Sequence, residues 1–242
     1  MQSSTDPDSR IAKLKDGRTH LAYKAEHVVD LKTDLVLAAE IHPANRADAD
    51  TLADSVMQAQ VNVNAANERF GRAAVEIEEV AADKGYHAAR TLELADALGP
   101  RTYIPEPKRA HKSRWADKPE AFRIAVLNNR RRTRRDKSRK LQRLRSERVE
   151  RSFAHVCDSG GARRSWLRGL ADVTKRYLIA VAAHNLGRVL RKLFGIGKPR
   201  GLQGGLGLTA LVQSTVTAIR PRLTGLAPAL TRPTPMRKPI AA

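Results

Sequence analysis

Residues 79–88, "EVAADKGYHA", give the clearest indication of the fold, since they hold a short apolar run that ends at an acid. The run over 80–82 predicts a short buried strand, and after Asp83 comes the turn-prone Lys84-Gly85. An acid in this position is commonly a helix N-cap or a solvated loop residue. The end of a strand is also where α/β proteins form binding sites, because their ligands bind beyond the carboxyl ends of the strands. Asp83 therefore has two interpretations, a capping or loop acid and a metal ligand.

The segments on either side of this strand alternate between strand and helix patterns. We expect strands over 21–30 and 34–41 that form a hairpin around the polar turn 31–33, and a further strand over 102–105. We expect helices over 48–66, 87–98, 139–157 and 170–193. Gly99 and Pro100 end the second of these helices. The order up to residue 105 is β-β-α-β-α-β, which predicts an α/β fold with a mixed sheet and flanking helices.

Three further segments show no strong periodicity. Residues 1–20 are expected to be an irregular lead-in to a domain over 21–195. Within that domain, residues 106–138 are expected to be a basic insertion, whose arginine-rich part becomes helical only when phosphates neutralise it. Residues 196–242 are rich in Gly, Pro and Thr and hold no acid, which predicts a basic, mostly disordered tail.

The charge of the chain is unevenly divided. The 242 residues carry a formal net charge of +20. Residues 1–107 hold 12 basic and 18 acidic residues, a net of −6, whereas residues 108–242 hold 33 and 7, a net of +26. This asymmetry predicts a polyanionic partner for the second half. Nucleic acid is favoured, because each neutralised phosphate releases counterions, and an anionic membrane surface is the weaker alternative.

The cysteine content and the apolar segments indicate the compartment. The single cysteine, Cys157, excludes an intrachain disulfide and fits a reducing compartment. The polar first residues do not resemble a signal peptide, and the sequence has no run of about 18 apolar residues that would predict a transmembrane helix. We expect a cytoplasmic protein, associated with the nucleoid in a bacterium, that binds neither a membrane nor a small-molecule substrate.

The expected helix over 139–157 carries two acids among many arginines. Glu147 and Glu150 are three residues apart and therefore share a face. Glu147 is expected to pair with Arg151, one turn later on the same helix. Glu150 stands beside Phe153, and its environment is expected to be closer to the buried face that packs on a sheet.

Four long strings carry the strongest signal in the sequence. They are "TDPDSRIAKLKDGRTHLAYKAEHVVD" (5–30), "VAADKGY" (80–86), "VERSFAHVCDSGGARRSWLRGL" (149–170) and "KRYLIAVAAHNLGRVLRKLFG" (175–195). Together they resemble bacterial insertion-sequence transposases with a DDE active site, over residues 5–200. The resemblance implies a ribonuclease-H-like fold, partial in this chain, in which three acids hold two divalent metals beside a central sheet.

The resemblance also implies the roles of two acids. Asp83 matches the second acid of the family and Glu150 the third, so both are expected to be catalytic residues and ligands of Mg²⁺ (or Mn²⁺). Two such ions act on the attacking and leaving oxygens of a phosphoryl displacement, and carboxylates are their natural ligands. A histidine cluster is not needed for this chemistry. The scattered histidines, His27, His42, His87 and His155, are weak candidates for metal ligands.

The chain departs from the family pattern in two places. Related transposases carry the first acid on a strand upstream of the "TDPD" segment, so this strand and its acid are expected to be missing. Asp6, Asp8 and Asp30 stand in the wrong place for that role. Many relatives also have a lysine seven residues after the last acid, where this chain has Cys157. Phosphate contacts are therefore expected from other residues.

Arginines are the candidates for these phosphate contacts. The expected DNA-binding residues are Arg130, Arg131, Arg132, Arg134, Arg135, Arg163, Arg164 and Arg168. Trp166 lies among the last three, either as a core residue, the favoured interpretation, or as a base-stacking platform.

These observations predict the C-terminal part of a DDE transposase, for metal-dependent DNA strand cleavage and transfer. With two acids of three, it is expected to be inactive or crippled alone. The expected partner is DNA at transposon ends, with a homodimer as one option. The alternative is a non-catalytic basic nucleic-acid-binding protein. A ribosomal-type RNA binder fits the charge of the second half but not the acidic first half.

Overall fold

The computed structural model describes residues 3, 5–13, 17–108, 115–194 and 217. The chain forms two compact units, Met1–Asn185 and Leu186–Ala242, and both sheets belong to the first unit. The expected disordered tail, 196–242, lies outside the described residues except for Thr217.

The first sheet is antiparallel and joins strands that are consecutive in the chain. Its order is β1 (Arg10–Lys13), β2 (Thr19–Val29) and β3 (Val36–Pro43). The expected hairpin of β2 and β3 is confirmed. The turn between them forms without glycine. It is stabilised by the Asp30 carboxylate, which accepts hydrogen bonds from the amides of Lys32 and Thr33, at 3.1 Å each. Asp34 completes the turn with a left-handed φ of 63°.

The expectation of an irregular lead-in over 1–20 is wrong in part, because β1 and the start of β2 lie within it. Arg10 pairs with Ala22 and Lys13 with Thr19, in an antiparallel ladder. Gly17 lies between the two strands at φ 82°, a conformation that glycine adopts without strain. The strand has only four residues, two of them charged, so its own pattern is weak, and pairing with β2 stabilises it.

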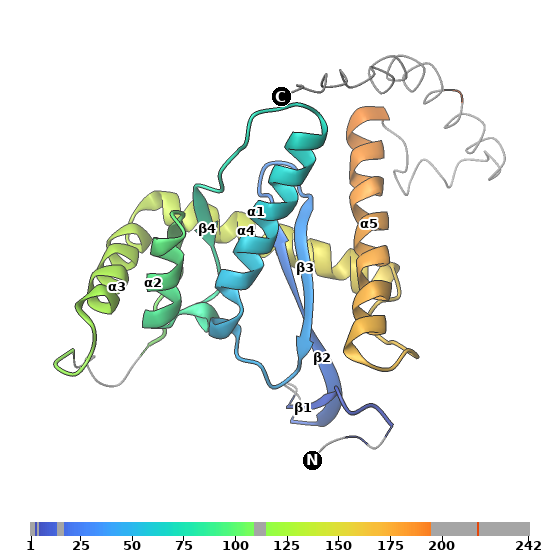
Figure 1. The fold of residues 1–242 in the computed structure, drawn as a ribbon, viewed down its shortest axis with the longest axis horizontal. Helices are drawn as coiled ribbons and strands as arrows, with labels where there is room; N and C mark the ends of the chain where they lie inside the picture. Colours follow the sequence, from blue (N-terminus) through green and yellow to red (C-terminus); the bar gives the residue numbers. More distant parts are fainter. Residues whose placement is uncertain (1–2, 4, 14–16, 109–114, 195–216, 218–242) are drawn as a thin grey trace, which may run out of the picture. The chain divides into compact units, whose positions relative to one another are not determined.

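Helix α1 (Leu52–Arg69) lies along β3 and β2 (Figure 1). The expected helix over 48–66 is confirmed, although its first residues form a 3-10 turn, η1 (Asp48–Asp50). Leu52, Val56 and Ala59 of α1 are buried, and the first two belong to a buried cluster with Leu92 and Ile104. Their i, i+4, i+7 spacing is the helical period that predicted the element.

The opposite face of the first sheet packs against later parts of the chain. Side chains alternate between the two faces of a strand, so Ala39 and Ile41 lie opposite Glu40 and His42. Helix α5 (Leu170–Phe194) and the π-helical turn η3 (Ala154–Ser159) cover this second face. The buried members of this cluster are Val36, Ile41, Val156, Val173, Tyr177 and Val181.

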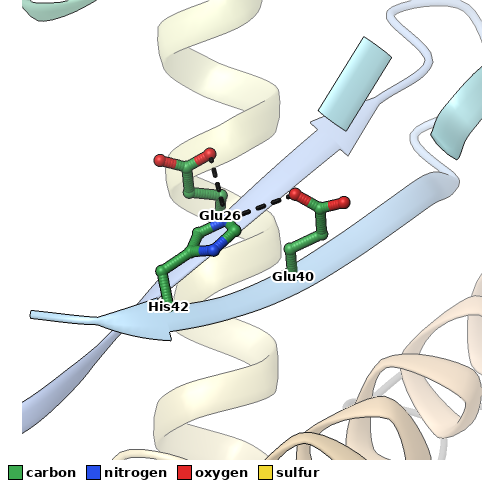
Figure 2. A group of neighbouring side chains, drawn as sticks. All are labelled: Glu26, Glu40 and His42. Carbon is green, nitrogen blue, oxygen red and sulfur yellow. Dashed lines mark ion pairs between the residues drawn. The ribbon is translucent and has the colours of Figure 1, made fainter. Parts of the chain in front are cut away.

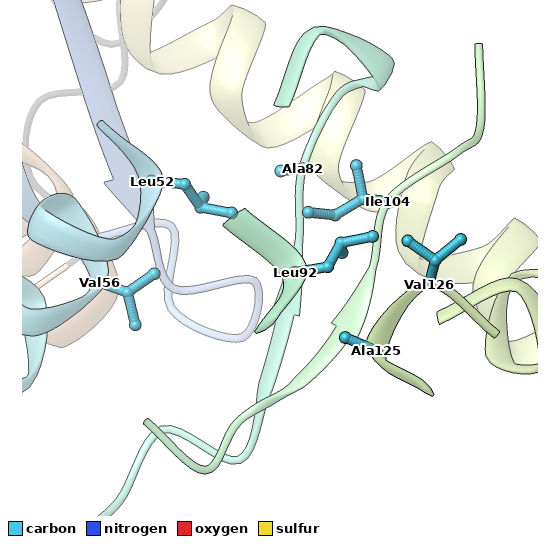
Figure 3. Close-up of a cluster of buried hydrophobic side chains, with 7 residues drawn as sticks. All are labelled: Leu52, Val56, Ala82, Leu92, Ile104, Ala125 and Val126. Atoms are coloured by element: carbon cyan, nitrogen blue, oxygen red, sulfur yellow. The ribbon is translucent and has the colours of Figure 1, made fainter. Parts of the chain in front are cut away.

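The second sheet is parallel and holds the strand that ends before Asp83. It pairs β4 (Glu79–Ala81) with β5 (Arg101–Tyr103), as expected for a mixed α/β fold. The turn η2 (Lys84–Tyr86) and helix α2 (Ala89–Ala97) connect the two strands. Figure 3 shows the buried cluster of this region, formed by Leu52, Val56, Ala82, Leu92, Ile104, Ala125 and Val126.

The arginine-rich part of the basic insertion is helical. Helix α3 (Glu120–Thr133) packs against α2 and β5. It forms because one face is buried, through Ala125, Val126 and Asn129, while its arginines point away from that face or pair with neighbours. Of these three buried residues, Ala125 is small and Asn129 is polar, so the apolar periodicity of this face is weak in the sequence.

Helix α4 (Asp136–Phe153) links the two sheets, because it contacts β2 as well as β4 and β5 (Figure 1). The expected helix over 139–157 is confirmed, with its last turn widened into η3. The α/β class is therefore confirmed, and the arrangement is consistent with a partial ribonuclease-H-like fold. Among the described residues, none of the helices is both long and apolar enough to span a membrane.

Candidate functional site

Asp83 is separated from the end of β4 by one residue and lies at the N-cap position of η2, where its carboxylate makes no capping bond. Its backbone carbonyl accepts a hydrogen bond from the Tyr86 amide at 3.1 Å, whereas its side chain makes no capping bond to η2. The side chain is 58% exposed, and Arg145 of α4 lies beside it, with Nη2 3.9 Å from Oδ1. The capping interpretation is therefore not realised, and the carboxylate is accessible to a ligand.

Helix α4 is held across the carboxyl ends of both parallel strands. The side-chain amide of Gln142 donates to the carbonyl of Ala82 at 3.1 Å and to that of Tyr103 at 2.6 Å. Its oxygen accepts a bond from Arg145 at 3.0 Å. The same side chain thus anchors α4 and orients the guanidinium that faces Asp83.

Glu150 lies on α4 about a turn and a half beyond Arg145. It is exposed, and Oε1 accepts a hydrogen bond from the Ser146 hydroxyl at 2.7 Å. Our expectation of a more buried environment for Glu150 is wrong, because Ser152 occupies the buried position and Phe153 stacks on His27, with ring centroids 4.0 Å apart. That the carboxylates of Asp83 and Glu150 share a metal stays a prediction.

The other acids near α4 are neutralised by arginines. Glu147 pairs with Arg151 one turn later, as expected. The buried Asp34 carboxylate pairs with Arg148 and with Arg151, the latter at 3.2 Å. These pairs join α4 to the β2–β3 turn, so their role is structural.

A group of acids with a histidine lies under α1, where the sequence showed only scattered residues. Glu26 and Glu40 are directly opposite each other on β2 and β3. Figure 2 shows His42 beside both carboxylates, with Nε2 3.2 Å from Glu40 Oε2 and 3.8 Å from Glu26 Oε2. One ligand atom from each residue lies within 4.8 Å of the others, as in a metal site. The cross-strand register, which the sequence alone does not show, creates this group.

The surroundings of this group favour a hydrogen-bonded charge network over a metal centre. Lys24 lies 2.7 Å from Glu26 Oε1, and the hydroxyls of Thr51 and Ser55 donate to the Glu26 carboxylate at 2.6 and 3.2 Å. Arg46 lies 3.3 Å from His42 Nδ1, and a guanidinium can only donate. If the His42 ring is neutral, Nδ1 accepts the hydrogen bond from Arg46, so the proton is on Nε2, which then cannot bind a metal ion.

Tyr86 connects this network to the turn after Asp83. Burial, the charges of Glu26 and Asp48, and a hydrogen bond to Glu26 raise the pKa of Tyr86 well above its usual range. Gly85 packs closely on Asp48, because a Cβ at this position would lie 2.7 Å from Asp48 Oδ2. The "DKGY" turn is therefore held in place by its contacts with η1 and β2.

The arginines expected to bind DNA fall into two groups. Arg130 makes two hydrogen bonds to Glu106, Arg163 pairs with Asp158, and Arg132 bonds to Asp96 and Thr102, so these three are engaged within the chain. Among the described residues, the side chains of the following arginines are exposed and make no hydrogen bond or ion pair: Arg131, Arg134, Arg135, Arg164 and Arg168.

The two acids near the N-terminus have structural partners. Asp6 accepts hydrogen bonds from the Tyr23 hydroxyl at 2.7 Å and the Gly169 amide at 3.1 Å. Burial would raise the pKa of Asp6, but these bonds and those from nearby backbone amides lower it overall. Asp8 accepts a bond from the Leu170 amide at 2.9 Å. Both acids therefore cap the start of α5.

Trp166 is not a core residue, contrary to our favoured interpretation. Its side chain is 78% exposed, and the guanidinium of Arg176 lies over its ring at 4.3 Å from the centroid. The neighbouring Leu167 packs on the buried cluster instead. Sequence pattern misses this difference because it does not show which of two adjacent apolar residues turns inward in a loop.

The fold and these acids define a partial ribonuclease-H-like domain with carboxylates at a strand end and on the helix that crosses it. The family model of the transposase DDE domain matches residues 4–186, and the chain belongs to this family. The family acts on DNA and uses divalent metal ions. Comparison with curated proteins and with solved structures found no match.

Proposed function

We propose that this chain takes part in the cleavage and transfer of DNA strands during transposition, with Asp83 and Glu150 as metal ligands. The Asp83 carboxylate is the observation that supports this most. It is exposed near the end of a parallel strand, makes no capping bond and has Arg145 beside it. An insertion-sequence origin, action at transposon ends, a homodimer and association with the nucleoid belong to the same proposal.

The donor set fits a hard divalent cation. Exposed carboxylate oxygens suit Mg²⁺ and Mn²⁺, of which Mg²⁺ is our first choice. When bound, such ions activate the attacking oxygen and stabilise the leaving oxygen of a displacement at phosphorus. Arg145 offers a guanidinium for a DNA phosphate next to Asp83, and Gln142 holds it in that direction.

We also propose that this chain does not transfer DNA strands alone. The resemblance requires three acids, and the other candidates are engaged elsewhere. Asp6 binds Tyr23 and the start of α5, and Glu26 is paired with Lys24. Two exposed carboxylates leave much of the charge of two metal ions and a phosphate uncompensated, so binding of the second ion should be weak.

Metal titration tests the assignment. We expect weak Mn²⁺ binding, measured by calorimetry or by the loss of the free-ion EPR signal, that disappears in Asp83→Asn and in Glu150→Gln. Glu147→Gln is the matched control, because it removes an exposed carboxylate of the same helix and should leave binding unchanged. Loss of binding in Glu26→Gln, with Asp83→Asn unaffected, would place the ion under α1 and refute the proposal.

The activity assay is a gel measurement of nicking and strand transfer on DNA with candidate transposon ends. The unmodified chain should show neither reaction. Fusing the upstream strand of a family member, with its acid, should restore nicking at the ends. Robust cleavage by the unmodified chain would contradict the claim that it needs a third acid from elsewhere. If the fused protein cleaves no candidate end, the non-catalytic DNA-binding alternative is favoured.

A further inference from the structure

We propose that Trp166 is a stacking platform for an unpaired nucleobase, with Arg164 and Arg168 binding the phosphates around it. This inference rests on the proposed function only in taking DNA as the partner. Single exposed apolar side chains are common and need no special role. What distinguishes Trp166 is the way its ring is held and the charge around it.

One face of the indole ring is fixed by Arg176. Its guanidinium lies 4.3 Å from the ring centroid, within the range of cation–π contacts. The same guanidinium donates to the carbonyl of Arg164 at 3.0 Å and to that of Gly161 at 2.9 Å. Arg176 thus ties both sides of the loop together and supports the ring from one side, while 78% of the side chain stays exposed.

The loop that carries Trp166 is anchored on each side of it. The amide of Ala162 donates to the Val156 carbonyl at 3.2 Å, and Ala162 and Leu167 both pack on the buried cluster. Beyond Trp166, the Gly169 amide donates to Asp6. A ring held in this way loses little conformational freedom when a ligand stacks on it, which favours binding.

The charge of the loop selects an anionic ligand. Residues 160–169 contain three arginines and no acid. Arg163 pairs with Asp158, which leaves the side chains of Arg164 and Arg168 exposed and without a hydrogen bond or ion pair among the described residues. An aromatic ring beside free arginines is the combination that binds single-stranded nucleic acid, by stacking and by phosphate contacts. A base in a duplex keeps its faces covered, so the expected ligand is an unpaired or extruded nucleotide.

Fluorescence gives a direct readout of stacking. The chain has two tryptophans, and Trp115 is partly buried against the cluster of Figure 3. In the full-length Trp115→Phe variant, oligo(dT) is expected to quench the emission of Trp166. Trp166→Ala should weaken oligo(dT) binding about tenfold. Trp166→Phe should restore most of it, and duplex affinity should change little.

Ile179→Ala is the matched control, because this α5 side chain is 71% exposed and its loss should leave affinity for oligo(dT) unchanged. If Trp166→Ala binds oligo(dT) as well as the unmodified chain does, and oligo(dT) does not quench Trp166, the stacking proposal is overturned. The proposed function would still be supported in that case, because it depends on the binding of duplex DNA. Failure of the parent chain to bind either form of DNA would overturn both.

Discussion

His27 of β2 is held between two hydroxyl groups and an aromatic ring. Its Nδ1 lies 2.8 Å from the Ser152 hydroxyl, and its Nε2 lies 2.8 Å from the Tyr177 hydroxyl. Ser152 donates its own proton to the Val149 carbonyl, so it accepts from Nδ1, and Tyr177 then donates to Nε2. These bonds fit the neutral ring. Burial, together with the nearby His184, lowers the pKa of His27 to about 4.

We predict that this histidine makes stability depend on pH. An unfolded histidine binds a proton below about pH 6.5, whereas folded His27 does so only near pH 4. Its contribution to the free energy of unfolding is complete above pH 6.5 and lost as the pH falls to 4, on the order of 3 kcal/mol in all. Urea unfolding at several pH values measures this loss.

His27→Gln should flatten the dependence between pH 6.5 and 4. His20→Gln, an exposed histidine of the same strand, should keep it. An identical pH profile for His27→Gln and the unmodified chain would show that His27 is not the titrating group.

At the scale of secondary-structure elements, two asparagines connect helices to residues at the ends of strands. Asn129 of α3 accepts from the Ile104 amide at 3.0 Å and donates to its carbonyl at 2.8 Å. Asn185 of α5 makes the same pair of bonds to Val36, at 2.9 and 2.8 Å. Each side chain replaces a missing strand neighbour, so backbone groups that would be buried without partners are satisfied.

Asn129→Leu should therefore destabilise the first compact unit. The change leaves the buried amide and carbonyl of Ile104 without partners, at a cost of about 2–4 kcal/mol. Asn128→Leu is the control, because this neighbour is only half-buried and makes no side-chain hydrogen bond in the described part of the chain. Chemical denaturation gives both values. Equal losses for the two variants would mean that α3 does not depend on the Asn129 bonds.

At the scale of the whole molecule, charge is the feature that bears on DNA. Residues 108–151 hold 18 basic and 5 acidic residues, a net of +13. The structure separates these arginines by their contacts. Arg130 and Arg132 stabilise α3 through Glu106 and Asp96, whereas Arg131, Arg134 and Arg135 are exposed without partners. Only the second group can bind phosphates without first breaking a bond in the protein.

We predict that replacing Arg131, Arg134 and Arg135 together by Ala weakens duplex binding and its salt dependence. The slope of log K against log salt should become less steep by about three, because each phosphate contact contributes about 0.9. Fluorescence anisotropy at several salt concentrations measures the slope.

A triple variant of Arg46, Arg69 and Arg101, from the acidic first half, removes the same charge and should leave the slope nearly unchanged. An unchanged slope in the Arg131, Arg134 and Arg135 variant would place the DNA surface elsewhere.

The sequence by itself determined the elements with strong local periodicity and their order. The strand before Asp83, the helix ended by Gly99 and the β2–β3 hairpin all follow from patterns within a few residues. Asp83 and Glu150 could be singled out from the resemblance of their motifs, and the excess of arginine indicated a polyanionic partner. These features depend on neighbours in the chain, which the sequence displays directly.

Tertiary structure alone decided which residues meet. The pairing of Glu26 with Glu40 depends on strand register, and the packing of α3 depends on the bonds of Asn129 to Ile104, the residue after β5. The exposure of Trp166 depends on Leu167 turning into the core in its place. In each case the free energy comes from groups far apart in sequence, whose contacts no local pattern encodes.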